Sequence, residues 1–451
     1  MGCYTTFVMK FNICLLVMGL SLFATAGEIV VDAKTLSVEK RDGLVVSKPQ
    51  AKLPSWVSFS VDARTAGMHR LVVKNLPPKK YFLHTDIFQE GLFTVEQLAE
   101  GVDLEFKKGV TKVLLDKNPG TRLEDPNERR KWSQMYVEVT STRDGTPQPC
   151  YFWAPEKAKA VAVPLIVGLH TWSCDIRQLA HYKTVQAEAE RRGWAFVGPN
   201  FRGPNNTPQG CGSELAVQDI VDAVNFAKGK VKIDERRVYI IGGSGGGHMT
   251  LLMMGRHPEV FAAGAAFCPI SDIARWHADS LQDHPGREKG YAEMLESACG
   301  GTPSAKPSEY AARSPVTWLA NARKAGRPVY ICTGIHDGWI GSVPVGHTLR
   351  AYNILCEAKD RISEADIAYI EANQKLPPML DPGDAADPFY KGGMKIHLRR
   401  TSGNVRMTLF EGGHSGSFPA GFDFLARQVR GAAFDWSLPE TGESKAEALT
   451  H

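Results

Sequence analysis

The first hundred residues of the chain alternate short apolar runs with polar turns. The runs are rich in β-branched and aromatic residues and lie at residues 29–31, 44–46, 56–59, 71–73 and 81–83. Runs of this kind, bounded by turn-forming residues, are typical of β-strands. Thr94 and Gln97 stand three residues apart ahead of Gly101, which predicts one short capped helix. We therefore expect residues 27–130 to form a β-rich accessory module.

The pattern changes after about residue 134. Residues 136–139 and 150–153 flank an Asp-Gly turn, which predicts an antiparallel hairpin. Beyond the hairpin, strands are expected at 165–169, 194–197, 238–241, 329–333 and 405–410, and helices at 178–192, 215–227 and 248–256. This alternation predicts a mostly parallel, doubly wound sheet with helices on both faces. Residues 131–440 are therefore expected to form one large α/β domain.

Two long insertions interrupt this α/β pattern. The first, residues 273–324, lies where such folds carry a lid and contains Trp276 and Trp318. These aromatic side chains either pack the lid on the core or stack on a sugar or phenolic group. The second, residues 358–395, opens with a helix capped by Ser363. It either covers the substrate entrance or lies on the surface without a role in substrate binding.

The first 26 residues read as an export signal. Lys10 precedes an apolar run at residues 11–23, and Ala24-Thr25-Ala26 provides small residues for cleavage. The alternative is a membrane anchor, but the run is short for a bilayer span of about 20 residues. We expect cleavage after Ala26, no stable membrane anchor, and a secreted or periplasmic protein. Residues 441–451 are expected to be a polar tail.

Composition narrows the possible partners. The 451 residues carry 53 basic and 49 acidic side chains, a formal net charge of +4, without a basic cluster. A nucleic-acid partner is therefore not expected. The sequence has no Cys-x-x-Cys pair and no His-Glu-x-x-His run, so neither a metal nor another cofactor is predicted. The oligomeric state is left open.

Seven of the nine cysteines lie beyond the expected signal. An exported protein meets an oxidising compartment, where disulfides form. Cys174 and Cys211 both follow predicted core strands at one edge of the sheet, so they are the expected pair. The alternative is that the cysteines are small buried apolar residues.

The strongest chemical signal is a glycine-rich turn around Ser244. A predicted strand enters Gly242-Gly243-Ser244-Gly245-Gly246, and a predicted helix follows. Gly-x-Ser-x-Gly between a strand and a helix is the nucleophile-elbow pattern, in which a tight turn exposes the serine hydroxyl. A phosphate-binding loop is the rival interpretation, but no Lys-Ser or Lys-Thr follows the glycines.

Two later strands supply an acid and a histidine. The strand at 329–333 leads to Asp337, and the strand at 405–410 leads to His414. The chain order Ser244, Asp337, His414 is that of an α/β-hydrolase triad. His414 would accept the Ser244 proton and later protonate the leaving group, while Asp337 would orient the imidazole.

The expected oxyanion hole combines two backbone N–H groups. Gly245, directly after the nucleophile, supplies one of them. Thr171 or Trp172, after the strand at 165–169, supplies the other; the His170 side chain is a third possibility. His170, His248 and Trp339 are also candidates for the wall of the substrate pocket.

Residues 134–438 resemble the catalytic domain of the prolyl oligopeptidase family of α/β-hydrolases. The stretches that carry the resemblance lie at 200–203, 219–224, 233–244, 343–344 and 412–414. The resemblance implies a serine peptidase or a related esterase with Ser244, Asp337 and His414 as its triad. Three features depart from the family pattern: there is no room for a β-propeller, His170-Thr171-Trp172 replaces His-Gly-Gly, and Asp337 lies six residues before Val343.

The sequence is compatible with three different functions. The first is an exported, peptidase-like serine hydrolase that forms an acyl-enzyme. The second is an esterase that removes acetyl or feruloyl groups from carbohydrates or phenolics, which Gly246-Gly247-His248 and the β-rich module favour. The third is a binding protein on an inactive hydrolase scaffold. The expected substrate is accordingly a small molecule, a peptide or a glycan ester.

Overall fold

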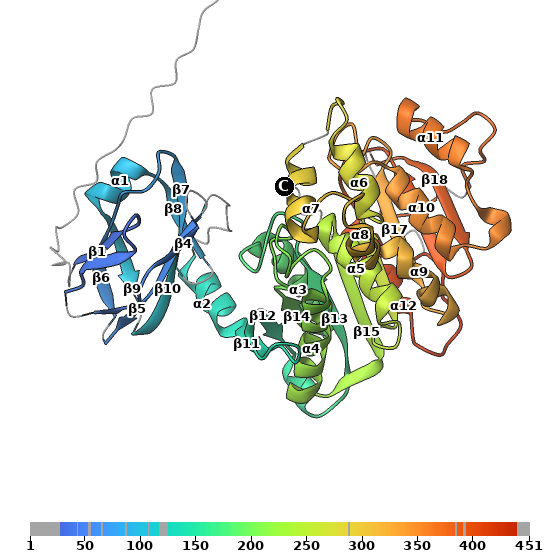
Figure 1. Cartoon of the computed structure of the whole chain (residues 1–451). Helices are drawn as coiled ribbons and strands as arrows, with labels where there is room; N and C mark the ends of the chain where they lie inside the picture. Colours follow the sequence, from blue (N-terminus) through green and yellow to red (C-terminus); the bar gives the residue numbers. More distant parts are fainter. Residues whose placement is uncertain are drawn as a thin grey trace, which may run out of the picture. The chain divides into compact units, whose positions relative to one another are not determined.

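The computed structural model describes residues 28–439, apart from 43, 53–55, 65, 86–87, 107, 117–124, 287–288, 384–385 and 391–393. The expected signal at 1–26 and the expected tail at 441–451 lie outside the described residues. The chain divides into two compact units, residues 1–86 with 90–119 and residues 87–89 with 120–451 (Figure 1).

The first unit contains two β-sheets. In the described part of the chain, one sheet has the strand order β2-β1-β6-β9 and the other β3-β5-β10-β7-β8, with β4 paired to β5. The strands are β1 Glu28–Asp32, β2 Ser37–Lys40, β3 Val45–Val46, β4 Gln50–Lys52, β5 Trp56–Ala63, β6 Gly67–Lys74, β7 Lys80–Thr85, β8 Phe88–Thr94, β9 Val102–Phe106 and β10 Gly109–Asp116. The expectation of a β-rich module is therefore confirmed.

Alternation along the strands explains the core of the first unit. In β5 every second side chain, from Val57 to Ala63, is buried, as a strand with one face toward a core requires. The buried side chains of both sheets form one apolar cluster. The predicted helix cap is also present: Thr94 accepts a hydrogen bond from the Gln97 N–H, and Gln97 Oε1 accepts one from the Thr94 N–H. This capping box begins α1 (Val95–Glu100).

A nine-stranded sheet forms the centre of the second unit, as far as the described residues show. Its order is β11-β12-β14-β13-β15-β16-β17-β19-β18. The six strands from β14 to β19 in this order are parallel, while β11, β12 and β18 pair antiparallel at the two edges. The strands are β11 Tyr136–Thr140, β12 Pro147–Trp153, β13 Val163–Leu169, β14 Ala195–Pro199, β15 Ile233–Gly243, β16 Ala263–Phe267, β17 Val329–Gly334, β18 Ile396–Ser402 and β19 Val405–Phe410.

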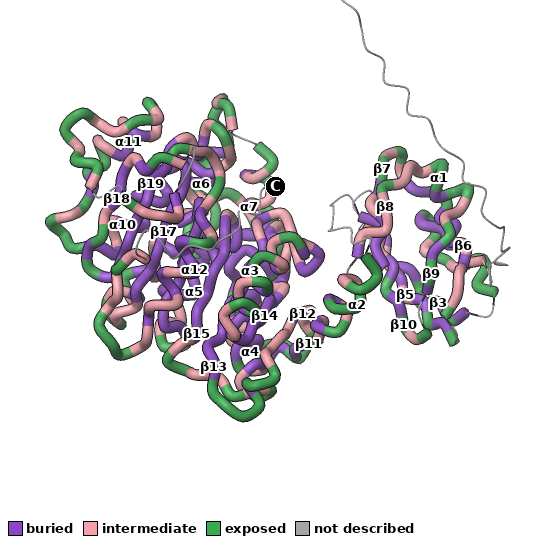
Figure 2. The backbone as a smooth tube through the Cα atoms, turned by 180° about the vertical axis from the view of Figure 1, so that it is seen from behind, coloured by how far each residue is buried: buried purple, intermediate pink, exposed green. Residues whose placement is uncertain are grey.

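Helices cover both faces of this sheet (Figure 1). The helices of the unit are α2 Pro126–Met135, α3 Leu179–Arg192, α4 Glu214–Lys230, α5 Gly245–Arg256, α6 Ile273–Ser280, α7 Lys289–Cys299, α8 Pro307–Arg313, α9 Pro315–Lys324, α10 Gly346–Leu355, α11 Glu364–Asn373 and α12 Phe418–Arg427. One apolar cluster joins α4, α5 and α10 to one face, and another joins α3 and α12 to the opposite face. The central strands are buried between these layers (Figure 2). This is the predicted α/β-hydrolase architecture.

The first insertion is largely helical, and the second begins with helical segments. Residues 273–324 form α6 to α9, and the second insertion contains α11, which begins after Ser363 as expected. Ser363 Oγ accepts a hydrogen bond from the Asp366 N–H at 3.0 Å, which caps the helix. No helix among the described residues has the length and apolar character needed to span a membrane.

Candidate active site

Ser244 sits on a sharp turn between β15 and α5. Its φ of 56° and ψ of −119° lie in a region that side-chain-bearing residues seldom occupy. The neighbouring glycines are required by space: a Cβ on Gly242 would lie 2.5 Å from the Gly246 backbone, and one on Gly246 would lie 2.4 Å from the Leu169 oxygen. The Ser244 N–H donates to the Phe267 carbonyl at 2.9 Å. The local geometry is therefore that of a nucleophile elbow.

Asp337 and His414 meet at the same edge of the sheet. Asp337 follows β17, His414 follows β19, and His414 Nδ1 lies 3.0 Å from both carboxylate oxygens. A carboxylate only accepts, so Nδ1 carries the proton and donates it to Asp337. Asp337 is 2 % exposed, and Thr333 Oγ1 donates to its Oδ2 at 2.8 Å. The remaining nitrogen, Nε2, is thereby left to accept a proton.

The loops that carry the acid and the histidine are tied together by their backbones. The His336 N–H donates to the Gly412 carbonyl at 3.0 Å, and the His414 N–H donates to the Ile340 carbonyl at 2.9 Å. Among the described residues, no hydrogen bond joins Ser244 to His414. Catalytic hydrogen bonds often shorten only when substrate binds. Phe267 connects the two sides of the site, because its carbonyl holds Ser244 and a Cβ on Gly416 would touch its ring.

Cys268 is a neighbour of His414 that the sequence did not single out. One ligand atom each of Cys268, Asp337 and His414 lie within 4.8 Å of one another. Burial alone would lower the pKa of His414, but the Cys268 sulfur and the Asp337 carboxylate beside the ring raise this pKa well above its ordinary value. The only sequence signal for Cys268 was its position directly after β16, beside the elbow.

The five residues between Asp337 and Val343 have a structural role. Gly341 has a φ of +121°, and a Cβ there would lie 2.2 Å from the His414 Cβ and 2.9 Å from Asp337 Oδ1. Trp339 Nε1 donates to the Glu371 carbonyl of α11 at 2.8 Å. The loop between Asp337 and Val343 therefore packs directly on the acid–histidine pair.

Gly341→Ala is expected to lower kcat/KM by about a hundredfold or more, because a displacement of about 1 Å at a reacting group costs that much. Steady-state kinetics with a chromogenic ester would measure it. Gly229→Ala is the matched control, because a Cβ at that position meets nothing within 4 Å. Unchanged kinetics in Gly341→Ala would mean that this loop does not position the histidine.

The loop after β13 reaches the elbow through Trp172. A Cβ on Gly245 would lie 2.4 Å from both the Trp172 nitrogen and its Cα. The Thr171 N–H is occupied, because it donates to Gln178 Oε1 at 2.9 Å. The two ring nitrogens of His170 face the Thr171 and Asn200 carbonyls at 2.8 and 2.7 Å. Of the three expected donors, only the Trp172 N–H adjoins Gly245 without a partner of its own in the described chain.

The three expected pocket residues lie in different environments. His170 is fully buried and stacks on Phe201, with 3.9 Å between ring centres. His248 is also fully buried, and its Nε2 lies 2.7 Å from the Arg313 carbonyl. Neither ring is exposed to a pocket. Trp339 is half-buried and lies edge-on to His284, so it alone of the three retains an accessible surface.

The aromatic residues of the first insertion pack inward. Trp276 is 1 % exposed, contacts Trp172 edge-to-face at 4.8 Å, and donates from Nε1 to the Ser342 carbonyl at 2.8 Å. Trp318 donates from Nε1 to the Ala312 carbonyl within the same insertion. Between the two interpretations offered by the sequence, this geometry is that of lid packing. The Trp276 ring thereby packs against the Trp172 side chain.

The expected Cys174–Cys211 disulfide is wrong. Both thiols are free, and Cys211 is fully buried in an apolar cluster with Trp276, Leu295 and Cys299 of the first insertion. The prediction failed because helices of this insertion cover Cys211, and the strand pattern does not reveal where they dock.

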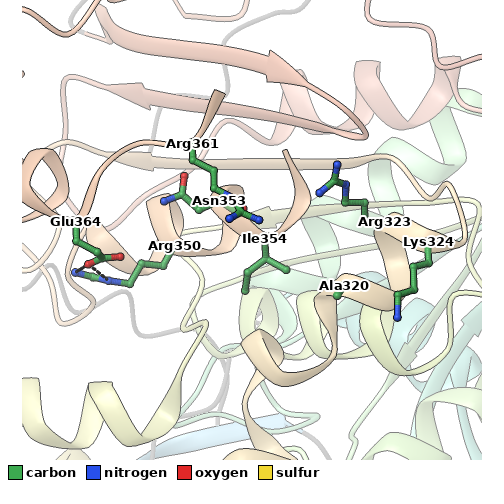
Figure 3. A pocket seen from close by; sticks show the side chains of 8 residues that line it. All are labelled: Ala320, Arg323, Lys324, Arg350, Asn353, Ile354, Arg361 and Glu364. Carbon is green, nitrogen blue, oxygen red and sulfur yellow. Dashed lines mark hydrogen bonds and ion pairs between the residues drawn. The ribbon is translucent and has the colours of Figure 1, made fainter. Parts of the chain in front are cut away.

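A hollow lined from α9, α10 and the start of α11 lies apart from this site (Figure 3). It is bordered by Ala320, Arg323, Lys324, Arg350, Asn353, Ile354, Arg361 and Glu364. Arg350 bonds Glu364 at 3.0 Å, so part of the positive charge is neutralised within the hollow. None of the three expected catalytic residues lines it.

Parts of the chain are similar to a known family and to curated proteins. Residues 175–368 match the model of the prolyl oligopeptidase family, a range that includes Ser244 and Asp337 and ends before His414. Feruloyl esterase B of Thermothelomyces thermophilus is 28 % identical over 147 residues, which are 31 % of this chain and 44 % of the relative. Dipeptidyl aminopeptidase BIII of Pseudoxanthomonas mexicana is 27 % identical over 221 residues, 45 % of this chain and 30 % of the relative.

Both matches span less than half the length of these curated relatives. A solved structure of acylaminoacyl peptidase in complex with Z-Gly-Gly-Phe-chloromethyl ketone covers 89 % of this chain and 59 % of its own, with 16 % identity and a TM-score of 0.45. The strand order of the nine-stranded sheet and the family match both indicate the α/β-hydrolase fold. The second unit has the α/β-hydrolase fold and resembles the catalytic domain of the prolyl oligopeptidase family.

Proposed function

We propose that the protein hydrolyses an ester or amide bond through Ser244, His414 and Asp337. The observation that carries the proposal is the His414–Asp337 contact of 3.0 Å at the sheet edge where the Ser244 elbow also lies. A serine hydroxyl is too weakly acidic to attack a carbonyl unaided. His414 Nε2 accepts the proton as Ser244 Oγ attacks, and Asp337 stabilises the imidazolium that forms.

The developing oxyanion needs two N–H donors that are already in place. We assign these to the Gly245 N–H, at the start of α5, and to the Trp172 N–H, which adjoins it. The positive end of the α5 dipole adds to the stabilisation. His414 then protonates the leaving group, and a water molecule activated by the same histidine hydrolyses the acyl-enzyme.

A peptidase-like hydrolase and an acyl esterase for carbohydrates or phenolics remain two candidates for the substrate. The prolyl oligopeptidase family match supports the first. The similarity to a protein named feruloyl esterase B supports the second. An N-terminal β unit of two sheets, residues 28–116 by its strands, accompanies the hydrolase domain, and we propose that it serves as an accessory module.

A panel of chromogenic substrates separates the two candidates. We expect hydrolysis of p-nitrophenyl acetate in either case, because an activated ester needs little binding energy from remote groups. Dipeptidyl anilides and acetylated or feruloylated sugars are then compared by kcat/KM. Turnover of anilides alone would identify a peptidase, turnover of sugar esters alone an esterase. Failure with every ester and anilide would contradict the hydrolase proposal itself.

We expect kcat/KM to rise with pH as His414 loses its proton. Only the neutral imidazole accepts the serine proton, and its neighbours hold the pKa above its ordinary value. Cys268→Ala removes one of these neighbours, so the rise of kcat/KM with pH should occur at lower pH. Cys356→Ala, which alters a buried thiol bonded to the Asn353 carbonyl, serves as the control. If kcat/KM of Cys268→Ala rose at the same pH as that of the wild type, the sulfur would have no influence on the pKa of His414.

We further propose that the protein is exported and cleaved after Ala26. The support is the sequence of residues 10–26. Amino-terminal sequencing of protein recovered from the periplasm or medium of an expressing bacterium tests this. Residue 27 at the amino terminus is the expected result, and uncleaved protein confined to the cytosol would contradict it.

A further inference from the structure

The loop between β13 and α3 is closed by the side chain of its last residue, Gln178. Gln178 Oε1 accepts the Thr171 N–H at 2.9 Å, and Gln178 Nε2 donates to the Thr171 hydroxyl, also at 2.9 Å. Thr171 is the second residue after β13, and Gln178 directly precedes α3. One side chain at the start of a helix therefore holds both the backbone and the side chain of Thr171.

A second amide side chain, that of Asn205, holds the same loop at the next residue. The Asn205 N–H and Asn205 Nδ2 both donate to the Trp172 carbonyl, at 3.1 and 3.0 Å. Asn205 is fully buried, and its Oδ1 accepts the Cys211 N–H at 3.0 Å, which fixes the direction of the amide. The peptide groups before Thr171 and after Trp172 are therefore both held by hydrogen bonds.

The peptide group between these two carries the Trp172 N–H. A trans peptide is planar, so its carbonyl and its N–H point in opposite directions. The Thr171 carbonyl accepts the Cys174 N–H of the same loop at 3.4 Å, so the Trp172 N–H points the other way. The Trp172 nitrogen adjoins the elbow, since a Cβ on Gly245 would lie 2.4 Å from it. Among the described residues, this N–H has no hydrogen-bond acceptor and is available to a substrate oxygen.

We propose that Gln178 is a positioning residue for the second oxyanion donor, an inference that rests on the proposed serine hydrolase function. In the described part of the chain, its side chain bonds to Thr171 and to none of the three expected catalytic residues. Gln178 acts through Thr171: it keeps the Trp172 N–H directed at the place where the oxyanion forms on the carbonyl that Ser244 attacks. A donor that is already in place needs no reorganisation when the charge develops.

A positioning role of this kind has a kinetic signature. The carbonyl oxygen of a bound ester carries little charge, whereas the tetrahedral intermediate carries a full negative charge on the same atom. The Trp172 N–H therefore stabilises the transition state more than the bound substrate. Loss of its orientation should lower kcat and kcat/KM equally and leave KM nearly unchanged. A general loosening of the fold would instead reduce the amount of active enzyme.

Gln178→Met and Gln178→Glu test the two hydrogen bonds to Thr171 at a half-buried position. Methionine has a similar length but makes neither bond, so kcat for p-nitrophenyl acetate should fall by about 10²-fold. Glutamate offers one oxygen to the Thr171 N–H and another to the Thr171 hydroxyl, so kcat should stay within about tenfold of the wild type. Gln218→Met, at a half-buried glutamine bonded to Asp222 on the same helix α4, is the control. Fluorophosphonate labelling at Ser244 counts the active sites, so that unfolded protein does not enter kcat.

An oxyanion analogue gives a second readout. A trifluoromethyl ketone adds to the nucleophilic serine, and its oxygen then occupies the oxyanion position. Its inhibition constant should rise in Gln178→Met by the same factor by which kcat/KM falls, and Gln178→Glu should largely restore it.

Three results would contradict the proposal. Wild-type kcat and inhibition in Gln178→Met, with turnover still abolished in Ser244→Ala, would overturn the positioning role and leave the proposed function intact. An equal loss of kcat in Gln178→Met and Gln178→Glu would show that the hydrogen bonds to Thr171 are not its cause. Turnover that persists in Ser244→Ala would reject the proposed function and the oxyanion donor together.

Discussion

Ser244→Ala is expected to lower kcat/KM by about 10⁴- to 10⁶-fold, the largest loss of any single substitution in this protein. The variant keeps the histidine, the acid and the N–H donors, but no atom remains to form the acyl-enzyme. Folding should be preserved, because the Ser244 side chain makes no hydrogen bond that caps α5. Burst kinetics with an activated ester and circular dichroism would measure the two properties separately.

Covalent labelling makes this test independent of the substrate. A fluorophosphonate probe should label the wild type at Ser244, as mapped by mass spectrometry, and should not label Ser244→Ala. Ser304→Ala, which changes an exposed serine in the first insertion, serves as the control and should label fully. Labelling at another serine, or turnover that persists in Ser244→Ala, would reject the nucleophile. Absence of labelling in the wild type would favour a binding protein on an inactive scaffold.

The elbow was predictable because its sequence requirements are local. Only glycine fits at positions 242 and 246, where a Cβ would touch backbone atoms, and the flanking strand is apolar. The helix, however, begins at Gly245 rather than at the expected residue 248. Glycine has a low helix propensity, so the pattern placed the start too late. Packing of the glycine run against β13 and β16 overrides that propensity.

Contacts made by the insertions were not predictable from local pattern. Trp276 contacts Trp172, and Cys299 shares a buried cluster with Cys211, across long stretches of chain. Strand periodicity specifies which face of a strand is buried, but not where an inserted helix docks. The same limit explains why Cys268 was overlooked: its position follows from a strand, whereas its contact with His414 depends on a loop more than a hundred residues later.

Asp337→Asn is expected to lower kcat by about 10⁴-fold while leaving the fold intact. The reason lies in the hydrogen bonds around the side chain. Thr333 Oγ1 donates to Asp337 Oδ2, so an asparagine oxygen would occupy that position and its NH₂ group would take the place of Oδ1, 3.0 Å from His414 Nδ1. An NH₂ group donates, and Nδ1 would then have to accept. The histidine proton would move to Nε2, the nitrogen that must receive the serine proton.

The tautomer argument gives Asp337→Asn a signature that a loss of folding would not produce. Removal of the carboxylate also lowers the pKa of His414, because Asp337 is one of the groups that raise it. The histidine proton resonance, followed by NMR against pH, should therefore titrate at lower pH in the variant than in the wild type. Asp103→Asn, at an exposed carboxylate of the first unit, should change neither kcat nor this titration. If Asp337→Asn retained kcat within tenfold of the wild type, His414 would not depend on Asp337 for its tautomer, and another group would have to orient it.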